Sequence, residues 1–325
     1  MKTEANKNLT LNPPQSTCNL KSVIRGYILN CRCEGKSEAT IHHYEGALRR
    51  YLFFCESCGD LKNPQDITPE DIRQFLWYLT SEPVRFNGSS PTARKPATIN
   101  TAENYYRTLH TFFNWLQREN LIPDNPVSHI KKPKVQKKVI EALKPEEVKA
   151  LLDQFNGKTF IDVRNRLILM MFLDTGMRVS ELTNLMIPDV DMQRGSILVR
   201  HGKGNKQRLV RIGSKTQKAL WQYTSLYRRG DSNRLFTDAS GKPLKRNAIK
   251  LMMNRLGKRV HLEGIHCHRL RHTFAISFLR AGGDVFSLQY LLGHSTLSMT
   301  QRYLQSLNAD DAFKAHKRFS PMDNF

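Results

Sequence analysis

The chain has 325 residues, and its 51 lysines and arginines against 29 aspartates and glutamates give a formal net charge of +22. A charge of this size favours an anionic partner, nucleic acid more than an anionic membrane or an acidic protein. The longest apolar run, residues 167–173, is too short to cross a bilayer. The first residues lack the apolar stretch of a secretory signal, so we expect a cytoplasmic, nucleoid-associated protein.

Helical periodicity begins after a polar segment, residues 1–18, which we expect to be a flexible tail. Apolar residues then recur three and four positions apart, which is typical of one face of an amphipathic helix. Thr68 and Pro69 form a helix start signal, a hydroxyl cap followed by proline in the first turn. The pattern predicts a four-helix domain over residues 19–128, with helices near residues 20–28, 41–52, 72–79 and 99–116.

The next segment, residues 129–142, has little apolar periodicity and is rich in lysine. A charge run of this kind is commonly a solvated face, but between two domains it is better explained by a chain that crosses a phosphate backbone. We therefore expect a basic linker whose DNA-binding candidates are Lys131, Lys132, Lys134, Lys137 and Lys138.

The rest of the chain, residues 143–325, is predicted to be a second domain, mainly helical with one small antiparallel sheet. Together the two domains define an α+β fold that is mostly α. The sheet is expected from two β-rich runs joined by a glycine-containing turn. A buried helix is predicted at residues 163–173, ending at Gly176, and the strands and turn at residues 196–200, 208–212 and 202–205.

Six cysteines are present, and four of them lie in two close pairs. Cys31 with Cys33, and Cys55 with Cys58, have spacings that a four-thiolate zinc site can use. Cys55 also continues an apolar helical stripe, and buried reduced thiols are common in cytosolic proteins. We therefore expect no metal, with zinc at these cysteines as the open alternative.

Several cationic residues of the second domain suit chemistry on a phosphodiester, which needs a nucleophile, charge stabilisation and an acid for the leaving oxygen. Arg178 lies between a helix that ends at a glycine and a new helical turn at Ser180. Glu181, three residues further on, is placed to orient the Arg178 guanidinium, although the pair is equally typical of an ion pair at a helix boundary.

His268 and Arg271 are one helical turn apart and therefore share a face. In the first turn of a helix the dipole would add to their attraction for phosphate, whereas a basic stretch on a basic protein is often plain surface. Lys203 is at the tip of the predicted hairpin, where it can reach into a cleft, although turn lysines are usually solvated. Lys206 competes with Lys203 for any such role.

His294 follows Gly293, which is expected to end a helix. Residues 298–301 match a capping box that opens the next helix, and Tyr303 lies about one turn into it. A lone tyrosine is usually a half-buried packing residue, so this position gains meaning from the other motifs.

Five blocks in this order resemble the tyrosine recombinase, or phage integrase, family, especially its Xer-type and mobile-element members. The resemblance covers roughly residues 20–310 and includes the nine-residue step from His294 to Tyr303. Lys144 departs from the family pattern where many relatives have a capping Ser or Thr, and Gln305 departs where a His often follows the tyrosine. The matching blocks are residues 175–182, 202–208, 268–275, 292–295 and 300–303.

The resemblance implies a site-specific DNA recombinase that uses Tyr303 as its nucleophile. The tyrosine would form a 3′-phosphotyrosyl bond and free a 5′-hydroxyl, and because that bond stores the energy, no ATP, metal or other cofactor is implied. Arginines would hold the phosphate, histidines would assist, and a lysine would protonate the leaving oxygen. The implied catalytic residues are Tyr303, Arg178, Lys203, His268, Arg271 and His294, supported by Glu181 and His272.

The implied partners are double-stranded DNA with specific recombination sites and further copies of the chain, a tetramer on two sites, with accessory proteins as a further option. Lys245 and Arg246 are weaker candidates for a groove contact. Residues 307–325 have the apolar content to dock either on a neighbouring copy or on the same chain. A DNA-binding module without chemistry, a type IB topoisomerase and a hairpin telomere resolvase remain as alternatives. The target DNA, and the choice among integration, excision, cointegrate resolution and dimer resolution, are not encoded in any motif.

Overall fold

The structure is a computed structural model that describes residues 19–59, 62–88, 91–135, 140–200, 207–307, 309–320 and 322–323. By its internal contacts the chain divides into two compact units, residues 1–137 and 138–325. Each unit has a hydrophobic core of its own. No helix in the described part of the chain is long and apolar enough to span a membrane.

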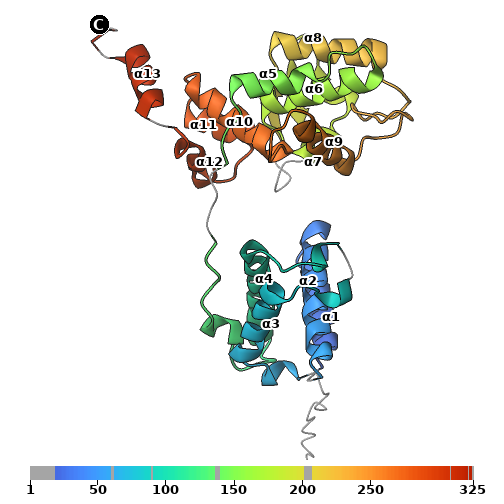
Figure 1. Cartoon of the computed structure of the whole chain (residues 1–325), viewed down its shortest axis with the longest axis vertical. Coiled ribbons are helices and arrows are strands. Elements are labelled where there is room, and N and C mark those ends of the chain that lie inside the picture. Colours follow the sequence, from blue (N-terminus) through green and yellow to red (C-terminus); the bar gives the residue numbers. More distant parts are fainter. Residues whose placement is uncertain are drawn as a thin grey trace, which may run out of the picture. The chain divides into compact units, whose positions relative to one another are not determined.

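The first unit contains four α-helices among its described residues, as the periodicity predicts (Figure 1). Each helix begins at a residue whose side-chain oxygen accepts a backbone N–H of the first turn, which satisfies a donor that the helix itself leaves free. The helices are α1 (Leu20–Cys33), α2 (Glu38–Ser57), α3 (Pro69–Ser81) and α4 (Ile99–Arg118), with caps at Asn19, Ser37, Thr68 and Thr98.

Aromatic side chains form the centre of this first core. The Tyr51 ring meets Phe75 and Phe113 edge-on, with centroids 5.0 Å and 6.5 Å apart. The loop between α3 and α4 is held by Arg85, a buried guanidinium that donates to the backbone carbonyls of Thr92 and Lys95. Short 3₁₀ helices complete the unit: η1 (Pro64–Asp66), η2 (Phe86–Gly88), η3 (Pro91–Ala93) and η4 (Pro126–His129).

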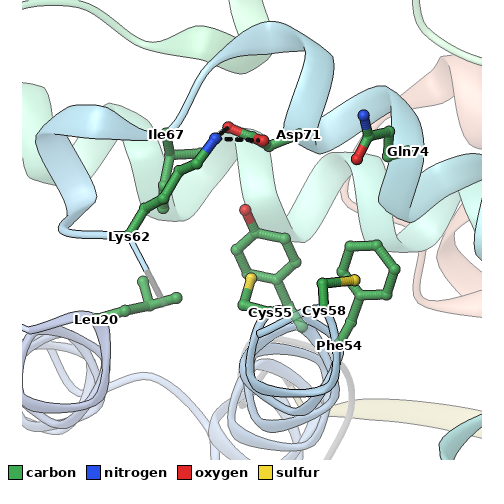
Figure 2. A pocket seen from close by; sticks show the side chains of 9 residues that line it. Leu20, Phe54, Cys55, Cys58, Lys62, Ile67, Asp71 and Gln74 are labelled. Carbon is green, nitrogen blue, oxygen red and sulfur yellow. Dashed lines mark hydrogen bonds and ion pairs between the residues drawn. The ribbon is translucent and has the colours of Figure 1, made fainter. Parts of the chain in front are cut away.

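The described cysteines of this unit, Cys31, Cys33, Cys55 and Cys58, are not grouped for metal binding. Cys55 and Cys58 line a small cavity of about 60 Å³ beside the ion pair of Lys62 and Asp71 (Figure 2). Burial raises the pKa of the Cys55 thiol to about 11, and Cys31 is fully buried. The described residues hold no group of three or more His, Cys, Asp or Glu side chains placed to bind a metal ion. The four-thiolate zinc alternative is therefore not supported by the geometry.

The second unit is mainly helical, which confirms the predicted fold class (Figure 1). Helix α6 (Phe160–Thr175) is its central element, with Leu167, Ile168, Leu169, Met171 and Phe172 fully buried. The other described helices of this unit are, in chain order, α5 (Pro145–Asp153), α7 (Val179–Asn184), α8 (Ser214–Gln222), α9 (Arg246–Arg259), α10 (Cys267–Arg280), α11 (Val285–Leu292), α12 (Leu297–Leu304) and α13 (Ala309–Phe319). A 3₁₀ turn η5 (Ile187–Asp189) and a π-helical turn η6 (Tyr223–Tyr227) also belong to this unit.

The sheet has three antiparallel strands in the order β1-β2-β3. The sequence pattern predicts two of these strands but not the first, because a strand of two residues is too short to show periodicity. The predicted hairpin turn lies outside the described residues. The strands are β1 (Val190–Asp191), β2 (Ser196–Val199) and β3 (Arg208–Arg211).

Helices α10, α11 and α12 pack together through a second cluster of buried residues (Figure 1). The cluster includes Phe274 of α10, Leu288 and Leu292 of α11, and Tyr303 of α12. This packing fixes the end of α11 against the middle of α10, and it places the ring of Tyr303 against both.

The start of α12 differs from the prediction. The helix begins at Leu297, and its N-terminal cap is Thr296, which makes no capping hydrogen bond with its side chain. The expected capping box from Ser298 to Gln301 is wrong, because the hydroxyls of Thr296 and Ser298 bond to each other at 3.0 Å.

Candidate active site

Gly176 gives the chain the sharp turn that places Arg178. The glycine ends α6 in the left-handed conformation, with φ of 59°. A Cβ at this position would lie 2.3 Å from the Phe274 ring, so both the conformation and the space require glycine. Arg178 then starts α7, and its backbone N–H and its Nη1 donate to the two carboxylate oxygens of Glu181 at 2.7 Å and 2.9 Å. The predicted pairing of Arg178 with Glu181 is present.

Glu181 has a second partner, Arg208, for which no role is predicted from the sequence. The buried Arg208 of β3 donates through Nη1 and Nη2 to the two oxygens of Glu181, at 3.0 Å and 2.7 Å. The sequence contains a signal for this contact. Arg208 and Val210 are two positions apart in the strand, so both side chains point to the core-facing side. An arginine on that side of a strand requires a buried partner.

Arg271 is buried and held by backbone carbonyls. Its Nη1 donates to the carbonyl of Gly176 at 2.7 Å, and its Nη2 donates to the carbonyl of Leu292 at 2.8 Å. Nη2 also lies 2.9 Å from Nε2 of His294. Burial, followed by the positive charge of Arg178, lowers the pKa of Arg271 to about 10. The positive charges of Arg178 and Arg271 repel each other, and a bound anion would relieve that repulsion.

His294 follows directly on Gly293, which ends α11 in the left-handed conformation as predicted. Its Nδ1 lies 2.9 Å from the hydroxyl of Thr300, a fully buried residue of α12. Burial lowers the pKa of His294 to about 4, and the charges of Arg271 and Arg178 add to that effect. The imidazole is therefore neutral at physiological pH and has a hydrogen-bond partner on each nitrogen.

Tyr303 lies between two histidine rings. Its ring is parallel to that of His294, with centroids 6.0 Å apart, and is tilted against that of His272, with centroids 5.2 Å apart. The Nε2 atom of His272 is buried and has no hydrogen-bond partner among the described residues. Burial and then the charge of nearby His268 lower the pKa of His272.

His268 is in the first turn of α10, where it interacts electrostatically with Arg271 and Arg178. Burial lowers its pKa, followed by the charges of Arg271 and His266. The His266 ring stacks on that of His268 at 6.5 Å, and its Nδ1 caps α10 by accepting the backbone N–H of Arg269 at 3.1 Å. The structure thus gathers seven of the predicted residues at one place: Arg178, Glu181, His268, Arg271, His272, His294 and Tyr303.

The remaining predicted residues belong to other segments of the chain or are not described. Lys203, Lys137 and Lys138 fall outside the described residues. Lys131, Lys132 and Lys134 are exposed, and Lys132 forms an ion pair with Glu103 at 2.7 Å. Two further exposed residues are at the start of α9, where Lys245 is the cap and Arg246 the first helical residue.

Comparison with protein families gives two matches that together cover most of the chain. The model of the phage integrase family matches residues 141–309. The model described as phage integrase, N-terminal SAM-like domain, matches residues 24–122. The first match contains every residue of the gathered site.

Curated relatives match over most of their own length. Tyrosine recombinase XerD of Halalkalibacterium halodurans is 32% identical over 83% of this chain and 87% of the relative. Tyrosine recombinase XerC of Lactobacillus delbrueckii subsp. bulgaricus is 36% identical over 82% of this chain and 88% of the relative.

Two solved structures share the fold. The Tn1549 transposon integrase in complex with circular intermediate DNA matches with a TM-score of 0.71 at 19% identity, over 91% of this chain and 99% of the other. A lambda integrase dimer bound to a COC′ core site matches with a TM-score of 0.68 at 20% identity, over 90% and 97%. On the family models and the curated relatives, the chain belongs to the phage integrase family and is a tyrosine site-specific recombinase.

Proposed function

We propose that Tyr303 is the nucleophile that cuts and rejoins DNA at a specific recombination site. The observation that carries this proposal is the packing of the Tyr303 ring against His294, whose Nε2 is 2.9 Å from Nη2 of Arg271. A phosphate bound by the Arg271 guanidinium would lie close to the phenol of Tyr303. This proximity is what an in-line attack on phosphorus requires.

Arg178 and Arg271 are the proposed phosphate-binding groups. The guanidinium group is planar and always charged, and its paired N–H donors match two oxygens of a phosphate. Arg178 and Arg208 both pair with the single carboxylate of Glu181, and Arg271 interacts with it electrostatically. The excess positive charge in a buried place favours the extra negative charge of the pentacoordinate transition state.

The proposed step exchanges one phosphoester bond for another. The Tyr303 oxygen forms a bond to phosphorus as the bond from phosphorus to the 5′-oxygen breaks, which leaves a 3′-phosphotyrosine and a 5′-hydroxyl. His268 assists removal of the phenol proton, and Lys203 donates a proton to the departing 5′-oxygen. A 5′-hydroxyl from another strand reverses the step and restores the phenol, so the reaction consumes no ATP and uses no metal.

The proposed substrate is double-stranded DNA with specific sites, bound by a tetramer on two sites, in the cytoplasm at the nucleoid. The net charge of +22 supports a polyanionic partner, and two solved structures of similar fold are bound to circular intermediate DNA and to a COC′ core site. In this proposal residues 19–128 bind core DNA, residues 129–142 cross the backbone with their lysines, and residues 143–325 carry out the chemistry. Lys245 and Arg246 add a groove contact.

A covalent-trapping experiment tests the nucleophile. The probe is a duplex recovered by selective binding from a random-sequence library, nicked next to the cleavage position so that the freed end diffuses away. Wild type and Tyr290→Phe, a control at an exposed tyrosine of α11, should form a protein–DNA adduct that survives denaturation. Tyr303→Phe should bind the duplex and form none. An adduct in Tyr303→Phe would remove Tyr303 from this role, and relaxation of plasmids without the site would indicate a topoisomerase.

A further inference from the structure

Arg208 is a buried cation to which the proposed steps assign no contact with the DNA. It is 5% exposed, begins β3, and pairs with Val199 of the neighbouring strand. A buried charge is costly unless it is fully hydrogen-bonded, so its partners indicate what the position does.

The guanidinium of Arg208 connects two segments that are far apart in the sequence. Nη1 and Nη2 donate to the two oxygens of Glu181, and Nε donates to the carbonyl of Leu291 at 2.7 Å, in the last turn of α11. The next carbonyl, that of Leu292, accepts from Arg271 at 2.8 Å and from Arg178 at 3.5 Å. One side chain thus holds both the carboxylate that orients Arg178 and the helix end that leads to His294.

Gly293 shows how closely this contact is built. A Cβ at Gly293 would lie 2.9 Å from Nη1 of Arg208 and 3.2 Å from its Cδ. Its φ of 62° is left-handed as well. The backbone that presents His294 therefore rests directly on the Arg208 side chain.

We propose that Arg208 is a positioning residue for strand cleavage, acting through Glu181 and the end of α11 on Arg178 and His294. This inference rests on the proposed function, in which Arg178 and Arg271 bind the scissile phosphate. By taking both oxygens of Glu181, Arg208 leaves a single side-chain bond between Glu181 and Nη1 of Arg178. The other N–H donors of Arg178 are then available to bind a phosphate, since they are not used for a second bond to the Glu181 carboxylate.

The electrostatics of Glu181 support this role. Burial opposes its ionisation, but the hydrogen bonds and charge of Arg208, followed by those of Arg178, keep its pKa below the ordinary value. Arg271 of α10 also faces this carboxylate, since the two groups interact electrostatically. Without Arg208, the carboxylate would stay buried and lose its strongest partner, so its pKa would rise, and its protonated form would orient Arg178 less well.

The test compares single-turnover formation of the Tyr303 adduct on the selected nicked duplex, at saturating protein. Arg208→Gln should bind the duplex like wild type and cleave about 10–100-fold more slowly, the usual loss for a residue that orients a reacting group. Arg208→Lys keeps the charge without the forked geometry, so it should restore part of the rate. The matched control is Arg164→Gln, another largely buried arginine that holds a backbone carbonyl, at Thr237, and it should cleave like wild type.

Two readouts separate positioning from a simple loss of structure. In Arg208→Gln the cleavage rate should rise with pH through an ionisation that wild type lacks, because Glu181 then titrates nearer neutrality. Adding Glu181→Gln should remove that ionisation, and the double variant should lose less than the product of the two single losses. A structural defect would lower the rate equally at every pH.

The outcomes separate this inference from the function on which it rests. Wild-type cleavage by Arg208→Gln would overturn the inference, as would a pH-independent loss that the double variant does not relieve. If Arg208→Gln fails to fold, cleavage by Arg208→Lys at the wild-type rate would overturn the inference. If wild type forms no adduct at Tyr303, the proposed function fails first.

Discussion

The imidazole of His294 lies parallel to the phenol of Tyr303, with ring centroids 6.0 Å apart and an angle of 4° between the planes. The hydrogen bonds of this imidazole determine its tautomer. Arginine can only donate, so Nε2 of His294 accepts from Arg271, and Nδ1 must carry the proton that reaches Thr300. On binding DNA, a phosphate would compete with His294 for the Arg271 donor.

Loss of the Thr300 hydroxyl should disturb this arrangement. Thr300→Val has nearly the same shape and leaves the Nδ1 proton without an acceptor, which costs about 1–3 kcal/mol when the group is buried. We expect about 10-fold or more slower adduct formation, and recovery in Thr300→Ser. The matched control is Thr237→Val, since the Thr237 hydroxyl is buried with no partner among the described residues. Equal rates in both valine variants would contradict the role of Thr300.

Acid should destabilise the second unit. The pKa of His294 in the folded protein is lowered from 6.5 to about 4, so its contribution to stability is present above pH 6.5 and is lost as the pH falls toward 4. His268 and His272 have lowered pKa values and act in the same direction. Thermal unfolding measured between pH 7.5 and about 4.5 should show a falling midpoint, with a smaller fall in His294→Gln.

His42→Gln, at an exposed histidine of α2, should leave that acid response unchanged. A midpoint that does not depend on pH in wild type would contradict the lowered pKa values. Bound duplex DNA should reduce the acid response, because a phosphate beside His294 favours its protonated form.

Lys203 can be tested by the chemistry of the leaving group. With a sulfur in place of the bridging 5′-oxygen, the leaving thiolate needs no proton, so Lys203→Ala should regain most of a loss of about 10²–10⁴ in cleavage rate. Arg178→Ala should stay slow on the same substrate, because it lacks phosphate binding instead. Lys206→Ala should cleave the ordinary substrate normally. Rescue of Lys206→Ala in place of Lys203→Ala would transfer the role of acid to Lys206.

DNA affinity should fall steeply with salt. Each phosphate contact contributes about −0.9 to the slope of log affinity against log salt. Lys131→Ala and Lys134→Ala should each reduce the slope by about 1. Lys132→Ala should reduce it less, because Glu103 already offsets part of the Lys132 charge. Fluorescence anisotropy with the selected duplex measures these slopes, and a flat titration in wild type would contradict the backbone contact.

Local sequence patterns determined the elements and the family. The helical periodicity of residues 20–116 predicts α1 to α4, because each helix must bury one face. Gly176 and Gly293 predict the ends of α6 and α11, because other residues adopt the left-handed conformation only at a cost. The spaced blocks around Arg178, Arg271 and Tyr303 identify the family without any structure.

The tertiary structure decided which side chains meet. The partners of Glu181, Arg271 and His294 come from segments far away in the sequence, so their hydrogen bonds depend on how helices pack and not on local periodicity. The predicted cap of α12 is wrong for a similar reason. A hydroxyl has several possible hydrogen-bond partners, and the folded geometry selects among them. The role of Arg208 was missed because strand periodicity indicates a buried side but does not name the carboxylate on it.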